Sequence, residues 1–214
     1  MKTVIYILRH GESVANAAGR VAGHSDSPLS ELGLRQAAIA ADALADVHFD
    51  AVYSSDLSRA YSTALPHAER RGLSITADKR LRELYVGEME NMSKTDIIEK
   101  YGTLYTVDWH HHFGTFVSPG GESVPEAADR AEKSLIDIGR ECLGKTVLVA
   151  THAGVLRALW GRISGIAPEE LCERLGYATN ASYSVVEWDG ERLIPVSYSN
   201  DYYLGELRTE WKDK

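Results

Sequence analysis

The run Thr146-Val147-Leu148-Val149-Ala150 narrows the fold of this chain more than any other stretch. Four apolar residues follow its first position without a polar interruption, and two of them are β-branched valines. Such runs are typical of strands that are buried on both faces, as in parallel sheets covered by helices. The rest of the chain must therefore supply helices for two faces of a sheet.

Segments on both sides of this run alternate between strand and helix patterns. Strands are expected over residues 3–8, 49–54, 74–77 and 146–150, and helices from Ser30 onward and over 57–71, 124–142, 155–164 and 168–175. The hydroxyl of Ser30 can cap the first of these helices. Residues 181–188 and 192–198 have the pattern of a hairpin that turns at Asp189-Gly190. This order predicts an α/β fold with a doubly wound, mostly parallel sheet and helices on both faces.

Residues 84–122 break the alternation, and we expect them to form an irregular, lid-like insertion. Aromatic residues stand among polar ones in this segment, at Tyr101, Tyr105, Trp109, Phe113 and Phe116. The run His110-His111-His112 lacks the ligand spacing of a metal site, so we expect it on the surface or in the lid. Because 214 residues suit one large α/β domain, we predict a single domain over residues 1–214.

Composition excludes several classes of partner. The formal net charge of -8 argues against nucleic acid or an anionic membrane, because both need broad basic surfaces. No apolar run approaches the roughly 20 residues that span a bilayer. The apolar start of the chain ends at Arg9-His10 without a cleavage site, so we expect a strand there and a cytoplasmic protein. The two cysteines lack CxxC spacing and are expected to be free thiols.

Two distant strands each end in a histidine. His10 follows Arg9 at the end of the first strand, and His152 follows the run that opened this section. Ligands of doubly wound sheets bind outside the carboxyl ends of the strands. Arg59 stands in the first turn of a helix, where the helix dipole disfavours a cation. An anion held near these residues accounts for both observations.

These residues lie in motif blocks that resemble those of the histidine phosphatase superfamily, also called the phosphoglycerate mutase-like family. The resemblance spans most of the chain. The blocks occur in family order and are Arg9-His10-Gly11-Glu12-Ser13 with Asn16, Asp26-Ser27-Pro28-Leu29-Ser30-Glu31-Leu32-Gly33, Ser54-Ser55-Asp56-Leu57-Ser58-Arg59-Ala60, Leu81-Arg82-Glu83 with Gly87, Pro119-Gly120-Gly121-Glu122-Ser123, and His152-Ala153-Gly154-Val155-Leu156-Arg157.

The resemblance implies a role for each matching residue. His10 is the expected nucleophile, since a neutral imidazole attacks phosphorus near pH 7 and forms a phosphohistidine intermediate. Arg9 and Arg59 are expected to bind phosphoryl oxygens through their planar forks. His152 is expected to donate to an equatorial oxygen of the transition state. Glu83 matches the proton donor to the leaving alcohol, a role for which Glu88 and Glu90 are neighbouring alternatives.

The same resemblance completes the expected pocket. Asn16 adds a neutral donor, and Gly23 and Ala153 are expected to bind the phosphate or substrate as well. No P-loop and no metal cage is visible in the sequence, so we expect neither a metal nor another cofactor. The sequence leaves a homodimer open.

The motifs are compatible with three functions. The preferred one is a metal-independent phosphatase of the histidine acid type, acting on a small phosphorylated metabolite. A cofactor-dependent phosphoglycerate mutase is the alternative, although the mutases carry a longer insertion and follow the second histidine with Gly-Asn-Ser, where this chain has Ala153-Gly154-Val155. The alternative from another class is a non-catalytic module that binds phosphorylated ligands. Such a module is expected to lose the nucleophile or the acid, and this chain retains both.

Overall fold

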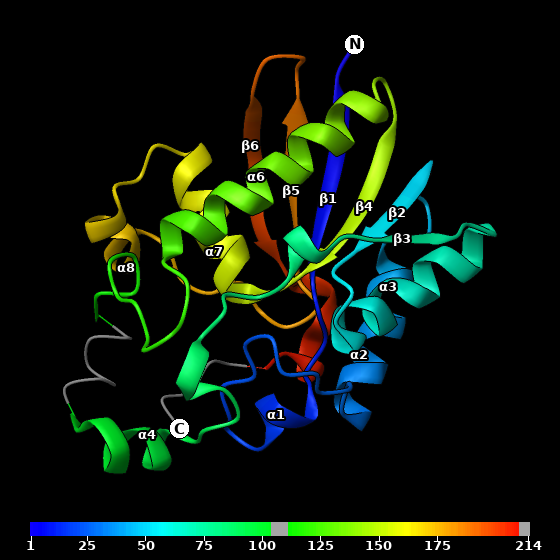
Figure 1. The fold of residues 1–214 in the computed structure, drawn as a ribbon. Helices are drawn as coiled ribbons and strands as arrows, with labels where there is room; N and C mark the ends of the chain where they lie inside the picture. The colour runs from blue at the N-terminus through cyan, green and yellow to red at the C-terminus, as the bar shows by residue number, and fades with distance from the viewer. Residues whose placement is uncertain (104–110, 210–214) are drawn as a thin grey trace.

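A single six-stranded sheet forms the centre of the computed structural model, which describes residues 1–103 and 111–209 (Figure 1). The strands are β1 (Thr3–Arg9), β2 (Ala51–Ser54), β3 (Ile75–Ala77), β4 (Thr146–Thr151), β5 (Tyr183–Trp188) and β6 (Leu193–Asn200), in the order β3-β2-β4-β1-β5-β6. β3, β2, β4 and β1 run parallel, whereas β5 and β6 form an antiparallel extension beside β1. The mostly parallel sheet that the sequence predicts is therefore confirmed.

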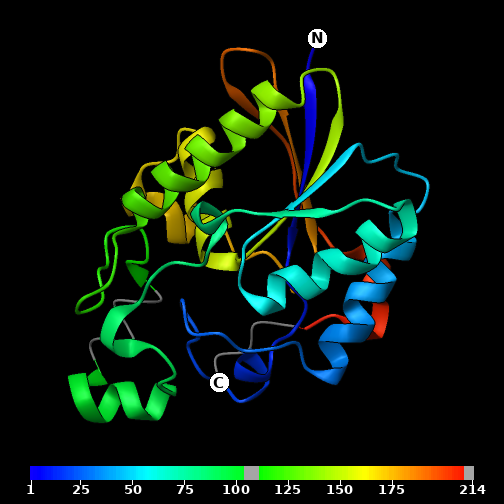
Figure 2. The ribbon, with the colours of Figure 1, turned by 45° about the vertical axis from the view of Figure 1, so that its right-hand side comes forward.

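Helices cover both faces of this sheet, as Figures 1 and 2 show. α2 and α3 pack on one face, and α6 and α7 pack on the other. The helices are α1 (Val14–Ala17), α2 (Glu31–Ala43), α3 (Ser58–Arg71), α4 (Lys94–Tyr101), α6 (Val124–Glu141), α7 (Ala153–Ile163) and α8 (Leu171–Arg174), with short 3-10 helices η1 (Lys79–Leu81), η2 (Gly87–Met89), η3 (Pro168–Glu170) and η4 (Tyr202–Leu207).

The apolar run in β4 is buried on both faces. Val147 and Val149 pack in the core beneath α6 and α7, whereas Leu148 and Ala150 pack in the core beneath α2 and α3. All four residues are fully buried. This is the arrangement that the unbroken apolar run predicts, because successive side chains of a strand point to opposite faces.

Two predicted elements differ from the structure. The helix predicted over 168–175 is wrong in its form, because the chain makes the 3-10 helix η3 first and only one α-helical turn in α8. The strand predicted from residue 181 begins at Tyr183, because Ala181 has a φ of 56°, in the left-handed region and outside regular strand geometry. The hairpin turn and the Ser30 cap of α2 are confirmed.

The segment predicted as a lid-like insertion, residues 84–122, contains two short helical elements among its described residues. These are η2 and α4, and the backbone of Asn91 donates to the carbonyl of Val21 at 2.7 Å. Phe113 is buried, whereas His111 and His112 are exposed. Tyr105, Trp109 and His110 lie outside the described residues. Within residues 1–103 and 111–209, no helix is long and apolar enough to cross a bilayer.

Candidate active site

The carboxyl ends of β1 and β4 bring the two predicted histidines together. Arg9 is the register partner of Thr151, and the backbone N–H of His10 donates to the carbonyl of Thr151 at 3.0 Å. His10 and His152 follow directly, with ring centroids 5.1 Å apart. Both side chains are buried. Parallel pairing of two strands thus places both rings in one site.

The surroundings of His10 decide which ring nitrogen can react. Its Nδ1 lies 2.6 Å from the carbonyl oxygen of Gly11. A carbonyl can only accept, so Nδ1 carries the proton and Nε2 of the neutral ring holds the lone pair. Burial lowers the pKa of His10 well below its ordinary value, and the charges of Arg59 and Arg9 lower it further. His10 is therefore a neutral base with one available nitrogen.

His152 has a different set of contacts. Its Nε2 shares a 2.8 Å hydrogen bond with Oγ of Ser55, at the end of β2. Nδ1 is buried and has no partner among the described residues. Burial, followed by the charge of Arg59, lowers the pKa of His152 well below its ordinary value. The Ser55 contact orients the ring, and Nδ1 remains for a ligand.

Two buried arginines, Arg9 and Arg59, lie close enough to His10 for their charges to lower its pKa. Arg9 donates from Nη1 to the carbonyl of Ala178, while its buried Nε has no partner among the described residues. Arg59, only 1% exposed, donates to the carbonyls of Gly23 at 2.7 Å and Ser25 at 3.1 Å. Burial lowers the pKa of Arg9 to about 10, and the negative charge of Glu83 opposes that shift. Two buried cations with donors to spare suit an anionic ligand.

The carboxylate of Glu83 is held by backbone N–H groups at the start of α7, the helix that follows His152. Its Oε1 accepts from the backbone N–H groups of Leu84 and Val155, and its Oε2 accepts from that of Gly154 at 3.1 Å. A Cβ on Gly154 would lie 2.7 Å from Oε1, so only glycine allows this approach. The negative charge of Glu83 also offsets part of the lowering that burial imposes on the pKa of Arg9 and of Arg59. The carboxylate therefore lies at the same site as the two arginines.

The remaining predicted residues border the same site. Oδ1 of Asn16 accepts from Ser13 N–H at 3.2 Å and from Nδ2 of Asn180 at 3.4 Å, and Asn180 also donates to the carbonyl of His10. The carbonyl of Gly23 accepts a hydrogen bond from Arg59. Ala153 is the first residue of α7 and is buried.

Three contributors to the site were not singled out in the sequence. Ser55 lies inside one of the motif blocks, which is a signal that could have drawn attention to it. Asn180 lies 164 positions from Asn16, and no pattern in the sequence links the two. The carbonyl of Ala178 carries no side-chain signal at all.

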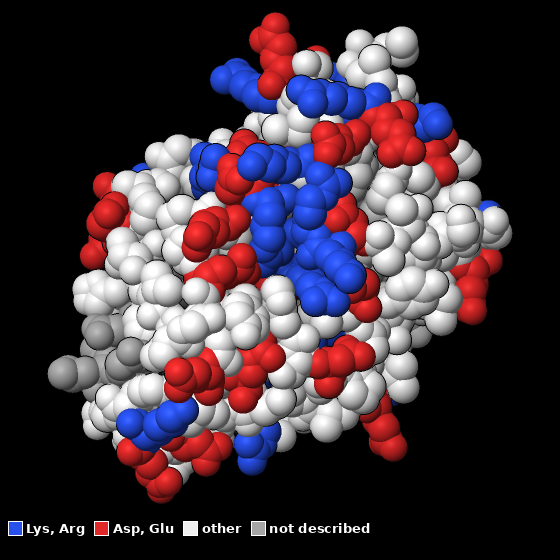
Figure 3. Space-filling model, viewed as in Figure 1, with Lys and Arg blue, Asp and Glu red and all other residues white. Residues whose placement is uncertain are grey.

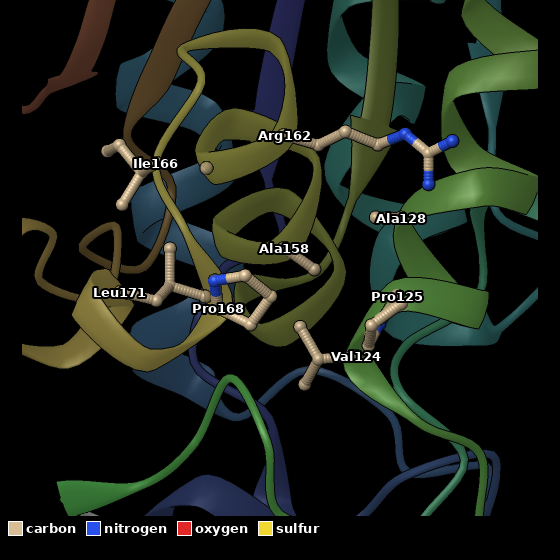
Figure 4. Close-up of a pocket in the computed structure, with 9 residues that line it drawn as sticks. Val124, Pro125, Ala128, Ala158, Arg162, Ile166, Pro168 and Leu171 are labelled. Carbon is tan, nitrogen blue, oxygen red and sulfur yellow. The ribbon is translucent and has the colours of Figure 1, made fainter.

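Two other surface features lie apart from these residues. A cavity of about 240 Å³ opens between α6, α7 and α8, lined mainly by apolar side chains such as Val124, Ala158 and Leu171 (Figure 4). Lysine and arginine side chains gather over α6 and the segment after β3 (Figure 3), where Arg80 and Lys133 pair with carboxylates. None of the predicted site residues lines that cavity, and no group of three potential metal-binding side chains occurs in residues 1–103 and 111–209.

Comparison with known proteins shows which family the chain is similar to. A model of the histidine phosphatase superfamily (branch 1) matches residues 5–201. The chain is 35% identical over 207 residues to a metal-independent phosphoserine phosphatase of Arabidopsis thaliana, covering 96% of this chain and 84% of that protein. It is 31% identical to phosphoserine phosphatase 1 of Hydrogenobacter thermophilus, covering 96% of each.

Solved structures of phosphatases have a similar fold. The fold is similar to that of a mycobacterial glucosyl-3-phosphoglycerate phosphatase in complex with VO3, with a TM-score of 0.84, 28% identity, and coverage of 92% of this chain and 99% of that chain. The chain belongs to the histidine phosphatase superfamily, as its motif blocks predict, and it is a phosphomonoester hydrolase of that family.

Proposed function

We propose that His10 receives the phosphoryl group and passes it to water. The observation that carries this proposal is the Nδ1–H bond to Gly11, which leaves Nε2 of a neutral ring available beside two buried arginines. Nε2 forms a bond to phosphorus while the ester P–O bond breaks, and Glu83 gives a proton to the departing oxygen. Water then attacks phosphorus and gives a proton to Glu83, the N–P bond breaks, and inorganic phosphate leaves.

The other site residues stabilise the charge that gathers on the phosphoryl oxygens. Arg9 and Arg59 have guanidinium N–H groups that can bind these oxygens in pairs. His152 supplies a further contact through Nδ1, which as a donor requires the ring proton on that atom, with Nε2 accepting from Ser55. Asn16 would donate from Nδ2, because its Oδ1 already accepts from Ser13 and Asn180. Gly23 and Ala153 would border the phosphate through their backbones.

For the substrate we propose a small phosphorylated metabolite, with phosphoserine as the first compound to test. Support comes from the two relatives that are named phosphoserine phosphatases and align with 96% of this chain. The test compares kcat/KM for phosphoserine, glucosyl-3-phosphoglycerate and 3-phosphoglycerate, with a chelator present. We expect phosphoserine to give the highest value. A higher value for another compound would reassign the substrate, and conversion of 3-phosphoglycerate only with bisphosphoglycerate would favour the mutase alternative.

We also propose one cytoplasmic domain over residues 1–214. The sheet takes strands from residue 3 to residue 200, which supports a single folding unit. Cys142 and Cys172 are both free thiols, as reducing compartments favour. Acidic side chains surround the basic cluster of Figure 3, and the net charge is -8, which fits a small-molecule substrate better than nucleic acid or a membrane surface.

A further inference from the structure

The direction of the Arg59 guanidinium depends on one short loop. Gly23 and Ser25 supply the two carbonyls that accept from Nη2 and Nη1. We call Gly23, His24 and Ser25 the 23–25 loop. Arg59 is almost fully buried, so its head group has little freedom beyond these contacts. Any shift of the loop would turn the guanidinium away from its present orientation.

Glu90 holds this loop from the other side. Its Oε1 accepts from the backbone N–H of His24 at 2.5 Å, and its Oε2 accepts from the hydroxyl of Ser25 at 2.5 Å. Gly23 has a φ of 52°, and a Cβ there would lie 2.6 Å from Oε1 of Glu90. The loop therefore requires glycine at this position, both for its backbone and for the approach of the carboxylate.

The same carboxylate connects the loop to the segment that carries Glu83. Glu90 follows Glu83 by seven residues, and His24 donates from Nε2 to the carbonyl of Glu83 at 2.7 Å. The loop is thus bonded to both ends of residues 83–90. Arg59, on the phosphate side, and Glu83, on the leaving-group side, are linked through it.

The charge of Glu90 also acts on Arg59. The negative charge of Glu90, together with those of Glu83 and Asp26, offsets part of the lowering that burial imposes on the pKa of Arg59. Both oxygens of Glu90 are already occupied by donors from the loop. This arrangement suits a carboxylate that holds the 23–25 loop in place.

We propose that Glu90 is a positioning residue that fixes Arg59 against the phosphate and relative to Glu83, through the 23–25 loop. The inference rests on the phosphate-binding role proposed above for Arg59. It assigns Glu90 a task different from that of the proton donor, for which the sequence left it as an alternative.

The test measures binding of orthovanadate, a mimic of the phosphoryl transition state, together with hydrolysis of an aryl phosphate and an alkyl phosphate. Glu90→Ala is expected to weaken vanadate binding and kcat/KM by roughly 10-fold to 100-fold, as misplacement of a charged group does. The loss should be the same for both phosphates. In an Arg59→Ala background, the same substitution should change either quantity by less than about threefold, because the residue through which Glu90 acts is gone.

Two further variants provide controls. Glu88→Ala removes a carboxylate two positions away that is exposed and pairs with Lys100 and Tyr101, and it should leave vanadate binding unchanged. Glu90→Gln keeps an acceptor for His24, and the Ser25 hydroxyl can turn to accept from the amide. It should recover most of the lost affinity. If Glu90→Ala unfolds, Glu90→Gln still separates positioning, which the amide preserves, from proton donation, which it cannot supply.

Several outcomes would overturn the inference. Equal losses with and without Arg59 would make Glu90 a general structural residue, and a much larger loss for the alkyl phosphate would make it the proton donor. Wild-type affinity in Glu90→Ala would remove it from the site. A wild-type protein that binds vanadate but hydrolyses neither phosphate contradicts the proposed function, while the comparison of vanadate affinities still tests Glu90.

Discussion

At the scale of single residues, the surroundings of the His10 imidazole favour its neutral form. Its burial and two neighbouring arginines oppose protonation, and the Gly11 carbonyl fixes the tautomer. The ring and the carbonyl belong to His10 and Gly11, two consecutive residues that directly follow β1, so the contact that fixes the tautomer is local. The ring should therefore stay neutral in mildly acidic solution, where an exposed histidine would be charged.

Glu83→Gln separates proton donation from simple electrostatics at the residue scale. Glutamine can still accept from Leu84 and Val155, but it cannot protonate a leaving oxygen. We expect kcat for an alkyl phosphate to fall by roughly 100-fold to 10,000-fold, the range of general acid catalysis. An aryl phosphate should lose less, because a phenolate departs with little help. Steady-state kinetics with both substrates measure this, and equal losses would make Glu83 a binding residue.

Sequence motifs identified the residues of the site that carry reactive or charged groups. His10, Arg59, Glu83 and His152 were expected, and the structure places them together, although their roles remain predictions. Residues that act through a contact across the fold were harder to find. Asn180 has no motif, and Glu90 could be recognised only once its distance to the 23–25 loop was known.

At the scale of elements, α3 contains a histidine that the proposed chemistry does not use. His67 is fully buried against Phe49, and neither ring nitrogen has a hydrogen-bond partner among the described residues. Burial, with the charges of Arg71 and Arg70, lowers its pKa from 6.5 to about 3. Below pH 6.5 the unfolded chain therefore binds a proton at this ring that the folded chain does not bind.

The free energy of unfolding should consequently fall as the pH drops from about 6.5 toward about 3. One such group contributes about 1.4 kcal/mol per pH unit across that window. His67→Leu should remove this contribution while changing the neutral-pH free energy of unfolding by less than about 1.5 kcal/mol. Urea unfolding at several pH values measures it, with the exposed His48→Gln as control. An unchanged acid slope in His67→Leu would contradict the account.

The predicted elements were most accurate where side-chain patterns were strong. β1 and β4 extend one residue beyond the predicted strands, because Arg9 and Thr151 continue their pairing. The α7 helix begins two residues earlier than predicted, directly after His152. In the 168–175 segment, Pro168 lies close against Gly114, a contact that local sequence does not reveal.

At the scale of the whole molecule, the first strand is completed by the last part of the chain. β1 lies between β4 and β5, so the N-terminal residues pair with residues 183–188. We predict a single unfolding transition, in which far-ultraviolet circular dichroism and tryptophan fluorescence have the same midpoint. Trp188 in β5 is buried and contributes to the second signal. Two separated transitions would contradict the single domain.

The central claim is that His10 carries the phosphoryl group during turnover. The measurement is to mix enzyme and substrate rapidly, stop the reaction in alkaline denaturant that preserves phosphohistidine, and locate the phosphoryl group by mass spectrometry of peptides. The account predicts one phosphorylated peptide, modified at His10, and its absence together with loss of hydrolysis in a folded His10→Ala variant. A phosphoryl group on another residue, or hydrolysis by His10→Ala at the wild-type rate, would contradict it.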